Sequence, residues 1–439
     1  MSDGAPVRRR RSSGPPSIRH GRLHKRRPIA TIAKILVATL GVLIVSGGSL
    51  AAIAAWDVAR TIKPGVHLAL PPGKTAVPIP SVGAIDGGVN LLLTGTDTRT
   101  GQGGAFNSAD ELNGSSGAGN NDVTMLLHIA QNHQSVTVVS FPRDMMIPIP
   151  QCPSQNGGSY DSVDKGMMNS TLSRGGLSCV VLTIEKLTGV TIPFAAEISF
   201  DGVSAMSNAV GGVTVCLASP VVDKYTNPAL DLAAGQQTIV GAEALSFLRS
   251  RHGVGDGSDL GRISNQQVFL SALARKIVSG GVLANPFQLY PLAKAAASNM
   301  TLSDTLTNPT TMVQIALAIK DTGLDKMTFI QYPVITDPDN VNRVIPQDSA
   351  AQVLDGALVN DQPVQLTGTT GRAAELNPNT PTPTPTPAQT VAPVTPGATP
   401  TPAPTPAPTP TPSGPAPVVL PDSISGQTAA EQTCTKGNG

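Results

Sequence analysis

Three clusters of charged and polar side chains stand out in this sequence, because charged residues make up only 13% of it. The first is Gly-Thr-Asp-Thr-Arg at residues 95–99, which supplies Asp97 and Arg99. The second combines Asn-Asp at residues 121–122 with Phe-Pro-Arg-Asp at residues 141–144. The third is the densest and lies within residues 249–266, where it contains Arg249, Arg251, His252, Asp256, Asp259, Arg262 and Gln266.

Several arginines with a few carboxylates indicate an anionic ligand that is held partly by a metal ion. The planar guanidinium group can bind two phosphate oxygens at once. Asp97 and Asp122 are candidate ligands for Mg²⁺, which binds through one or two carboxylates together with substrate phosphates. Taken singly, each of these side chains is better explained by a surface salt bridge or a turn, so no cluster alone identifies a reaction.

Alternating strands and helices predict an α/β layered domain that positions these clusters. Asp97 and Arg99 directly follow a predicted strand, and polar residues past strand ends line ligand crevices in such folds. Asp259, Arg262 and Gln266 share one helix face by their i, i+3 and i+7 spacing. The predicted strands are residues 89–94, 123–129, 135–141, 194–200, 213–217 and 327–332, and the predicted helices are residues 176–187, 202–210, 241–249, 259–278 and 311–320.

The N-terminal part predicts a membrane anchor. Residues 1–28 contain nine arginines and lysines against one acid, and their Ser, Gly and Pro content predicts a disordered tail. The apolar stretch at residues 35–55 is close to the ~20 residues that a transmembrane helix needs, and we assign residues 29–56 to that helix. Basic residues before the span predict a cytoplasmic N-terminus and an exported remainder. The alternative is a cleaved signal peptide, whose apolar core is usually shorter.

Composition divides the exported part. Residues 57–88 are rich in Pro and Gly and predict a stalk, and residues 89–364 predict the folded domain. Residues 365–421 predict a linker whose Pro/Thr tract is extended polyproline II. Residues 422–439 form a short C-terminal segment of unassigned role.

Four cysteines in an exported chain permit disulfides. Their spacing matches no zinc motif, and three connectivities are possible. Cys152 and Cys179 flank one polar loop and are the preferred pair. Cys216 lies in an apolar strand, where an ordinary buried thiol is the simpler expectation.

Five segments in order resemble the LytR–CpsA–Psr family, and the resemblance covers essentially the whole predicted domain. One such segment alone would be weak evidence, whereas five in sequence are specific. They are residues 90–99 (NLLLTGTDTR), 121–129 (NDVTMLLHI), 139–150 (VSFPRDMMIPIP), 208–216 (NAVGGVTVC) and 245–267 (LSFLRSRHGVGDGSDLGRISNQQ).

The resemblance implies a three-layer α-β-α domain with a central mixed sheet. It also implies a phosphotransferase that moves a glycopolymer from a polyprenyl-pyrophosphate carrier to a peptidoglycan sugar hydroxyl, with Mg²⁺ or Mn²⁺ as cofactor. Asp97 and Asp122 match the family's metal-associated acids. The expected pyrophosphate-binding residues are Arg99, Arg143, Arg249, Arg251, Arg262 and Gln266, and the expected catalytic residues are Arg143, Asp122 and Asp259.

The sequence departs from the family pattern in two places. Met167-Met168-Asn169 stands where the family often has Lys-Ile-Asn, and Lys165 lies two residues too early. Asn265-Gln266-Gln267 replaces Arg-Gln-Gln, which removes one positive charge.

Two other functions remain open. A hydrolase that cleaves the same lipid pyrophosphate with water would use the same arginines and metal. A non-catalytic lipid-carrier-binding protein or membrane sensor would use the fold without turnover. A nucleic-acid partner is not expected, because the folded domain is exported and has no basic recognition helix.

Overall fold

The computed structural model describes residues 28–71, 73–75, 88–99, 119–154, 157–282, 285–377 and 416–438. Its contacts divide the chain into two units, Met1–Trp56 and Asp57–Gly439. Helix α1 (Pro28–Thr61) begins in the first unit and ends in the second. Its portion Ile32–Thr61 is long and apolar enough to cross a membrane, judged by length and composition. Residues 1–27 of the basic tail predicted at residues 1–28 lie outside the described residues, and Pro28 is the first residue of α1.

The second unit is built on a seven-stranded mixed sheet, as the resemblance implied. Strands β1, β2 and β3 form an antiparallel centre, and parallel pairs β1–β8 and β3–β14 extend it on both sides. Antiparallel strands β13 and β20 form the two edges. The order is β13 (Met300–Leu302), β8 (Phe194–Ile198), β1 (Val89–Thr96), β2 (Asn121–Ile129), β3 (Val136–Phe141), β14 (Met327–Gln331) and β20 (Gly426–Thr428).

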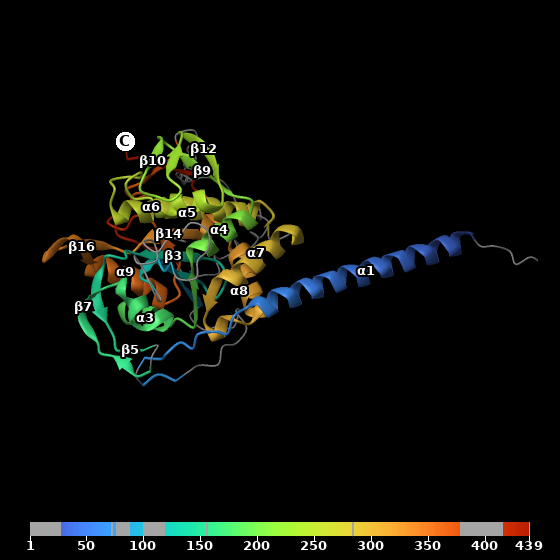
Figure 1. The fold of residues 1–439 in the computed structure, drawn as a ribbon, viewed down its shortest axis with the longest axis horizontal. Helices are drawn as coiled ribbons and strands as arrows, with labels where there is room; N and C mark the ends of the chain where they lie inside the picture. The colour runs from blue at the N-terminus through green and yellow to red at the C-terminus, as the bar shows by residue number, and fades with distance from the viewer. Residues whose placement is uncertain are drawn as a thin grey trace, which may run out of the picture. The chain divides into compact units, whose positions relative to one another are not determined.

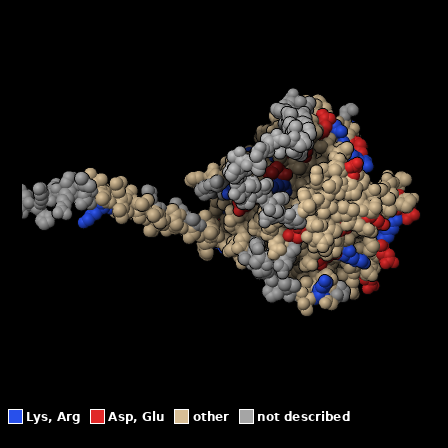
Figure 2. Space-filling view, turned by 180° about the vertical axis from the view of Figure 1, so that it is seen from behind, with Lys and Arg blue, Asp and Glu red and all other residues tan. Residues whose placement is uncertain are grey.

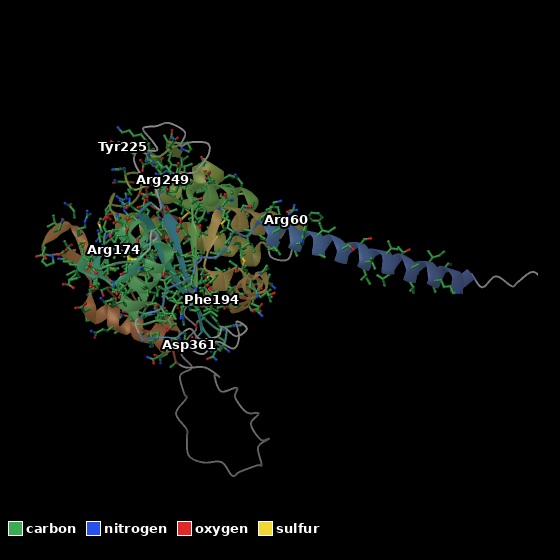
Figure 3. The ribbon with its side chains drawn as sticks, turned by 60° about the horizontal axis from the view of Figure 1, so that its bottom comes forward. Arg60, Arg174, Phe194, Tyr225, Arg249 and Asp361 are labelled. Atoms are coloured by element: carbon green, nitrogen blue, oxygen red, sulfur yellow. A yellow bond between two sulfur atoms is a disulfide. The ribbon has the colours of Figure 1, made fainter. Side chains whose placement is uncertain are left out.

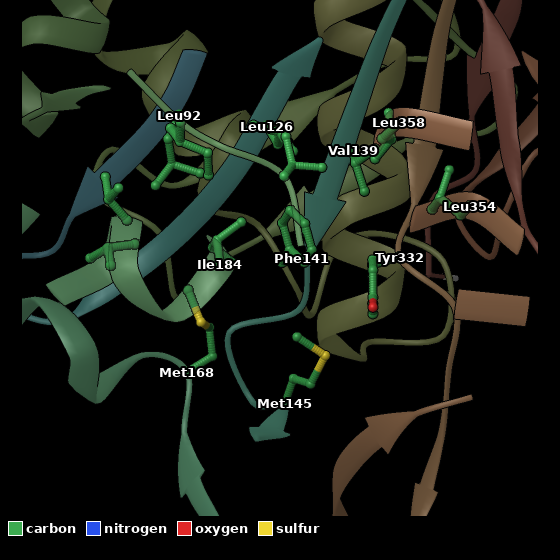
Figure 4. Packing of buried hydrophobic residues seen from close by; sticks show 14 of the residues in the cluster. Leu92, Leu126, Val139, Phe141, Met145, Met168, Ile184, Tyr332, Leu354 and Leu358 are labelled. Carbon is green, nitrogen blue, oxygen red and sulfur yellow. The ribbon is translucent and has the colours of Figure 1, made fainter. Parts of the chain in front are cut away.

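Helices cover both faces of this sheet and complete three layers (Figure 1). On one face, Leu92 and Leu126 pack with residues of α3 (Ser170–Thr188) and α9 (Asp348–Val359), as Figure 4 shows for part of the cluster. On the other face, Leu91 and Met125 pack with residues of α6 (Asp259–Ser279) and α8 (Pro309–Thr322). Every residue of β3 is buried, and its sequence VTVVSF accordingly has apolar residues on both faces of the strand rather than on alternate positions only.

The predicted helices near the site are confirmed with small shifts. Helix α5 spans Gly241–Arg249, and α6 begins at Asp259 after an N-cap at Ser258, whose side chain accepts from the Gly261 amide. Helix α3 starts earlier than expected, because a first turn precedes a kink at Gly175 and Gly176. Gly176 has φ 65°, which is why the sequence needs glycine there.

The predicted end of the domain at residue 364 is too early. Strand β17 (Val364–Gln365) pairs with β19 (Val418–Val419), and β20 forms an edge of the central sheet. Strands β18 (Ala374–Leu376) and β21 (Thr433–Thr435) join β9 (Val213–Leu217) and β12 (Gly235–Ile239) in a four-stranded sheet. Residues 365–377 and 416–438 therefore belong to the fold, and the Pro/Thr tract at residues 378–415 lies outside the described residues.

Both disulfides tie distant parts of this unit together. The preferred pair, Cys152 and Cys179, is bonded. The expectation of an ordinary thiol at Cys216 is wrong, because Cys216 is bonded to Cys434 across a separation of 218 residues. The two cysteines face each other because β21 runs parallel to β9, with Cys434 opposite Cys216.

The predicted stalk is also part of the fold where it is described. Val66 forms a bridge to Ser303, Leu68 is buried in the core, and the Ala69 amide donates to Ser178 Oγ at 2.7 Å. The helix predicted at residues 202–210 is confirmed as α4 (Phe200–Ala209). The sequence analysis missed helices α7 (Pro286–Asn299), η2 (Asp304–Leu306) and η3 (Leu324–Lys326). It also missed the strand pairs β4 (Met146–Ile149)–β7 (Val163–Met167), β5 (Cys152–Pro153)–β6 (Ser159–Tyr160), β10 (Val221–Asp223)–β11 (Leu230–Leu232) and β15 (Val334–Asp337)–β16 (Asn340–Pro346).

Candidate active site

The candidate site begins where β1, β2 and β3 meet at one end of the sheet. Thr124 of β2 is paired with Phe141 of β3, so Asp122 and Arg143 face each other one pleat further along. Arg143 Nη1 donates to Asp122 Oδ1 at 2.5 Å. Burial by itself would lower the pKa of Arg143, but the carboxylates of Asp122, Asp259 and Asp144 outweigh it and raise that pKa.

Asp259 is the acid that joins the arginines into one cluster. Its Oδ1 lies 2.6 Å from Arg262 Nη2, 3.1 Å from Arg251 Nη2 and 3.7 Å from Arg143 Nε. The side chain is only 9% exposed, so these contacts are shielded from water and salt. Its place in the first turn of α6 also suits a carboxylate, because the helix N-terminus favours negative charge.

Arg262 connects α6 to the sheet. Its Nη2 donates to the backbone carbonyl of Asp122 at 2.9 Å. The last turn of α5 and the segment after it add Arg249 and Arg251 to the same region. Burial is the main cause that lowers the pKa of both, and neighbouring arginines add to it: Arg99 and Arg262 beside Arg249, and Arg262 and Arg143 beside Arg251. The Arg249 guanidinium also lies over the Phe200 ring, 4.2 Å from its centroid.

Positive charge exceeds negative charge in this cluster. Figure 2 shows a hollow in one face where acidic and basic atoms meet amid mostly uncharged surface. Six arginines stand against four aspartates in the interactions described above and below, namely Arg99, Arg143, Arg249, Arg251, Arg262 and Arg343 against Asp97, Asp122, Asp144 and Asp259. Such a surplus, partly desolvated, favours an anion.

Several polar atoms of the cluster have hydrogen-bonding capacity to spare. Arg143 Nε, Arg262 Nε and Asp259 Oδ2 are buried and have no hydrogen-bond partner among the described residues. Arg143 Nε does lie 3.7 Å from Asp259 Oδ1, which is an ion-pair distance but too long for a hydrogen bond. Unpartnered guanidinium N–H groups in a buried site are suited to phosphate oxygens.

Asp97 is held in place by the next segment of chain. Its carboxylate accepts from the Asn120 amide at 2.6 Å and from Asn120 Nδ2 at 3.1 Å. Gly119 has φ 71°, and a Cβ there would meet the Thr98 amide nitrogen at 2.5 Å, so only glycine allows this close approach. Thr96, just before Asp97, is opposite Asn121, just before Asp122, which brings both acids to the same end of the sheet.

The two acids fit a hard divalent cation by their chemistry. Mg²⁺ takes oxygen ligands and often only one or two carboxylates, with waters and substrate phosphates completing its shell. Among the described residues, no group of three or more His, Cys, Asp or Glu side chains is arranged to hold a metal ion by itself. Asp97 and Asp122 both contribute to the electrostatic environment of Arg249, which places metal-ligand candidates and arginines in one site.

The predicted binding residue Gln266, and Lys165 from the segment that departs from the family pattern, have structural contacts of a different kind. Gln266 is buried, and its Nε2 donates to the Leu248 carbonyl at 2.9 Å, which ties α6 to α5. Lys165 pairs with Asp337 at 2.9 Å and Asp339 at 2.5 Å in the β15–β16 hairpin. Arg99 lies within electrostatic range of Arg249.

The sequence analysis missed Asp144 as a site residue and missed Arg343 altogether. Arg343 of β16 lies 3.5 Å from Asp144 Oδ1, and Arg251 lies 4.0 Å from Asp144 Oδ2. Asp144 follows Arg143 directly, which was an available signal. No signal in the sequence pointed to Arg343, because it comes from a hairpin some two hundred residues further along the chain.

Several known proteins with similar sequences are named for bacterial cell-wall synthesis. The chain is 34% identical over 217 residues to the probable cell wall biosynthesis protein LcpB of Corynebacterium glutamicum, covering 49% of each chain. It is 26% identical over 265 residues to the polyisoprenyl-teichoic acid–peptidoglycan teichoic acid transferase TagT of Bacillus subtilis, covering 59% of this chain and 74% of that one. The chain spans about half the length of the corynebacterial relatives that it matches.

The fold agrees with a solved structure, the LytR-Csp2A-Psr enzyme from Actinomyces oris. The TM-score is 0.50 at 23% identity, over 68% of this chain and 96% of that one. Residues 73–358 match the LytR_cpsA_psr family, which is more than half of the chain. The chain therefore belongs to the LytR_cpsA_psr family.

Proposed function

We propose that this chain is a cell-wall glycopolymer ligase. It transfers a glycopolymer from a polyprenyl-pyrophosphate carrier to a sugar hydroxyl of peptidoglycan. The observation that carries the proposal is the Asp259-centred cluster, in which Arg143 and Arg262 keep unpartnered buried N–H groups and both contact Asp122. The name of the Bacillus subtilis relative supports the same substrates.

The proposed reaction is the displacement of polyprenyl phosphate from a phosphorus atom by a sugar hydroxyl. The acceptor hydroxyl oxygen attacks the phosphorus next to the glycan, and the bond from that phosphorus to the bridging oxygen of the pyrophosphate breaks. Polyprenyl phosphate leaves, and a phosphodiester joins glycan to peptidoglycan. Such a reaction depends on positioning and on stabilising charge rather than on a covalent nucleophile.

The arginines of the cluster supply both requirements. Arg143, Arg251 and Arg262 hold the pyrophosphate oxygens, and Arg249 and Arg99 add positive charge to the same site. Asp259 orients three of these guanidinium groups before substrate binds. The Asp122 carboxylate contacts one arginine in the described structure, whereas the Asp259 carboxylate contacts three. Of these two acids, Asp122 is therefore the better candidate to accept the proton of the acceptor hydroxyl.

We propose Mg²⁺, or Mn²⁺ in its place, as the cofactor, with Asp97 and Asp122 as its protein ligands. A divalent ion there would offset the negative charge of the phosphate oxygens. The donor set agrees with this, since both ligands are carboxylates and the remaining ligands would come from water and substrate.

The proposed location follows from α1 and from the charges that precede it. We place α1 in the cell membrane as a single-pass anchor, with the N-terminus in the cytoplasm and the unit Asp57–Gly439 outside. Nine basic residues before the span support this orientation. The partners are then a lipid-linked glycan donor, peptidoglycan and the membrane, and no nucleic acid.

The test uses the full chain in detergent micelles with Mg²⁺, a short polyprenyl-pyrophosphate glycan and a peptidoglycan oligomer. Mass spectrometry should find the phosphodiester-linked product, and Arg143→Ala or Asp97→Ala should abolish it. Arg174→Ala is the matched control, because Arg174 lies over the Tyr160 ring and has no described contact with the cluster. Release of polyprenyl phosphate alone would establish the hydrolase, and binding without turnover would establish the lipid-carrier-binding sensor.

A further inference from the structure

Helices α7 and α8 leave apolar side chains exposed. On α7, Phe287 is 88% exposed and Leu289 is 38% exposed. On α8, Val313 and Leu317 are 56% and 47% exposed, and their i, i+4 spacing places them on one stripe. The opposite side of α8, with Ile315 and Ala318, is buried in the core, so this helix has apolar residues on both faces.

These two helices flank the C-terminal end of the membrane-length segment Ile32–Thr61. Asp57 accepts from Tyr290 Oη at 2.6 Å and from Lys294 Nζ at 2.7 Å, and both donors belong to α7. Ile62 packs against the buried cluster that includes Ile315 and Ala318 of α8. The chain therefore enters the second unit between α7 and α8, within a few residues of the end of Ile32–Thr61.

Basic side chains accompany the apolar ones. Lys320 continues the stripe of Val313 and Leu317 at i+3 and is exposed, and Lys63 is exposed just after the segment ends. Lysine near apolar side chains is suited to a lipid surface, because its stem lies along the apolar part while the ammonium group reaches the headgroups. Exposed apolar patches rimmed by polar residues mark protein or membrane contacts.

We infer that the exposed face of α7 and α8, formed by Phe287, Val313 and Leu317, rests on the lipid bilayer that anchors α1. If the segment before Asp57 spans the membrane, Asp57 must lie at the membrane surface. Its hydrogen bonds to Tyr290 and Lys294 then hold α7 at that surface. The apolar side chains beside it then enter the interfacial layer rather than water. This docking does not depend on the proposed transferase activity.

The chain offers a direct reporter for this contact, because Trp56 is its only tryptophan. The full chain is reconstituted in phosphatidylcholine vesicles that contain brominated lipid, which quenches tryptophan fluorescence on contact. In a Trp56→Phe background, Phe287→Trp and Val313→Trp each place one reporter on the proposed face. Val341→Trp is the control, since Val341 is 81% exposed on β16, and Figure 1 shows β16 on the side of the domain away from α7 and α8.

Brominated lipid should lower fluorescence at positions 287 and 313 at least twofold and leave position 341 unchanged. Adding Leu317→Asp to the Phe287→Trp variant should at least halve the quenching. Wild-type Trp56 reports whether the anchor itself contacts lipid. The inference is overturned if positions 287 and 341 are quenched alike, or if Trp56 is quenched while 287 and 313 are not. It is equally overturned if Trp56 is not quenched, because its premise of an anchored chain then fails.

Tyr225→Trp provides a second control on another part of the unit. Tyr225 is 69% exposed, and Figure 3 shows it well separated from Arg60, which lies next to the entry point between α7 and α8. Circular dichroism melts of each variant show that the substitutions leave the fold intact. Quenching at position 225 as strong as at position 287 would mean that the domain associates with lipid without a preferred face, which also overturns the inference.

Discussion

Replacing Cys216 and Cys434 together by alanine should destabilise the protein more than removing the other disulfide. The bond closes a separation of 218 residues, for which the chain-entropy relation gives about 5.4 kcal/mol. The Cys152–Cys179 bond closes 27 residues, which corresponds to about 3.5 kcal/mol. The free energy of unfolding should therefore fall by roughly 2 kcal/mol more in the first variant than in the second.

The same bond secures the helix that carries much of the site. The C-terminal segment contacts α6 through Gln427 Nε2, which donates to the Gln267 carbonyl and to Ser271 Oγ at 2.9 and 2.7 Å. Thr435 Oγ1 donates to Asn265 Oδ1 at 2.8 Å inside the core. Without the disulfide, these hydrogen bonds can still form, but the C-terminal segment is no longer covalently held against α6. Local opening of the segment therefore costs less free energy.

Pulse proteolysis in increasing urea, with the full chain in detergent micelles, measures the fraction folded for wild type and both double variants. The Cys216→Ala/Cys434→Ala variant should lose folded protein at the lowest urea concentration, and its first cleavages should lie in residues 416–438. Equal midpoints for the two double variants, or a lower midpoint for Cys152→Ala/Cys179→Ala, would refute the reasoning from loop length.

Three further predictions concern the site and the core. Asp259→Asn should lower stability by about 2 kcal/mol but tighten binding of inorganic pyrophosphate about tenfold, because three guanidinium groups lose their shared carboxylate. Asp355→Asn should stabilise the protein at pH 8 by on the order of 2 kcal/mol and change little at pH 4. Burial raises the pKa of Asp355 to about 7 against the hydrogen bond from Tyr332, so stability falls as pH rises from 3.8 through about 7. Gly175→Ala should cost about 1–3 kcal/mol, because its Cβ would meet Cys179 Cβ at 2.7 Å, whereas Gly356→Ala in open space on α9 should gain roughly 0.5–1 kcal/mol.

Each of these predictions has its own control. For Asp259→Asn, thermal unfolding and isothermal titration calorimetry are compared with Asp256→Asn, whose partner Arg372 is exposed. Unchanged or weaker pyrophosphate binding would show that Asp259 does not restrain the arginines. For Asp355→Asn, the urea midpoint at pH 4 is the internal control, and equal effects at pH 4 and 8 would contradict the assigned titration. For the glycines, the two substitutions control each other, and a loss at Gly356 as large as that at Gly175 would mean that the close contact is not the cause.

Much of the central fold follows from local sequence. Strands β1, β2 and β3 could be predicted because their apolar, β-branched runs end in polar turns, and α5 and α6 because their spacing and flanking glycines are local signals. The same locality placed Asp97, Asp122 and Arg143 at strand ends and Asp259, Arg262 and Gln266 on one helix face. The family resemblance rests on these segments too, since each is a continuous stretch of chain.

Only the tertiary structure decided which of these residues touch. Asp259 contacts three arginines at once because α6 packs against α5 and β3. The spacing of residues along the chain does not encode this packing. Arg343 enters the site from β16, and residues 416–438 return to pair with β14 and β9 through strands of three residues or fewer. Strands that short carry almost no periodic signal, and their stability comes from partner strands that are 100 residues away for β20 and 218 residues away for β21. Local patterns therefore determined the elements, whereas long-range pairing and burial determined the site, because contact energies depend on neighbours in space rather than in sequence.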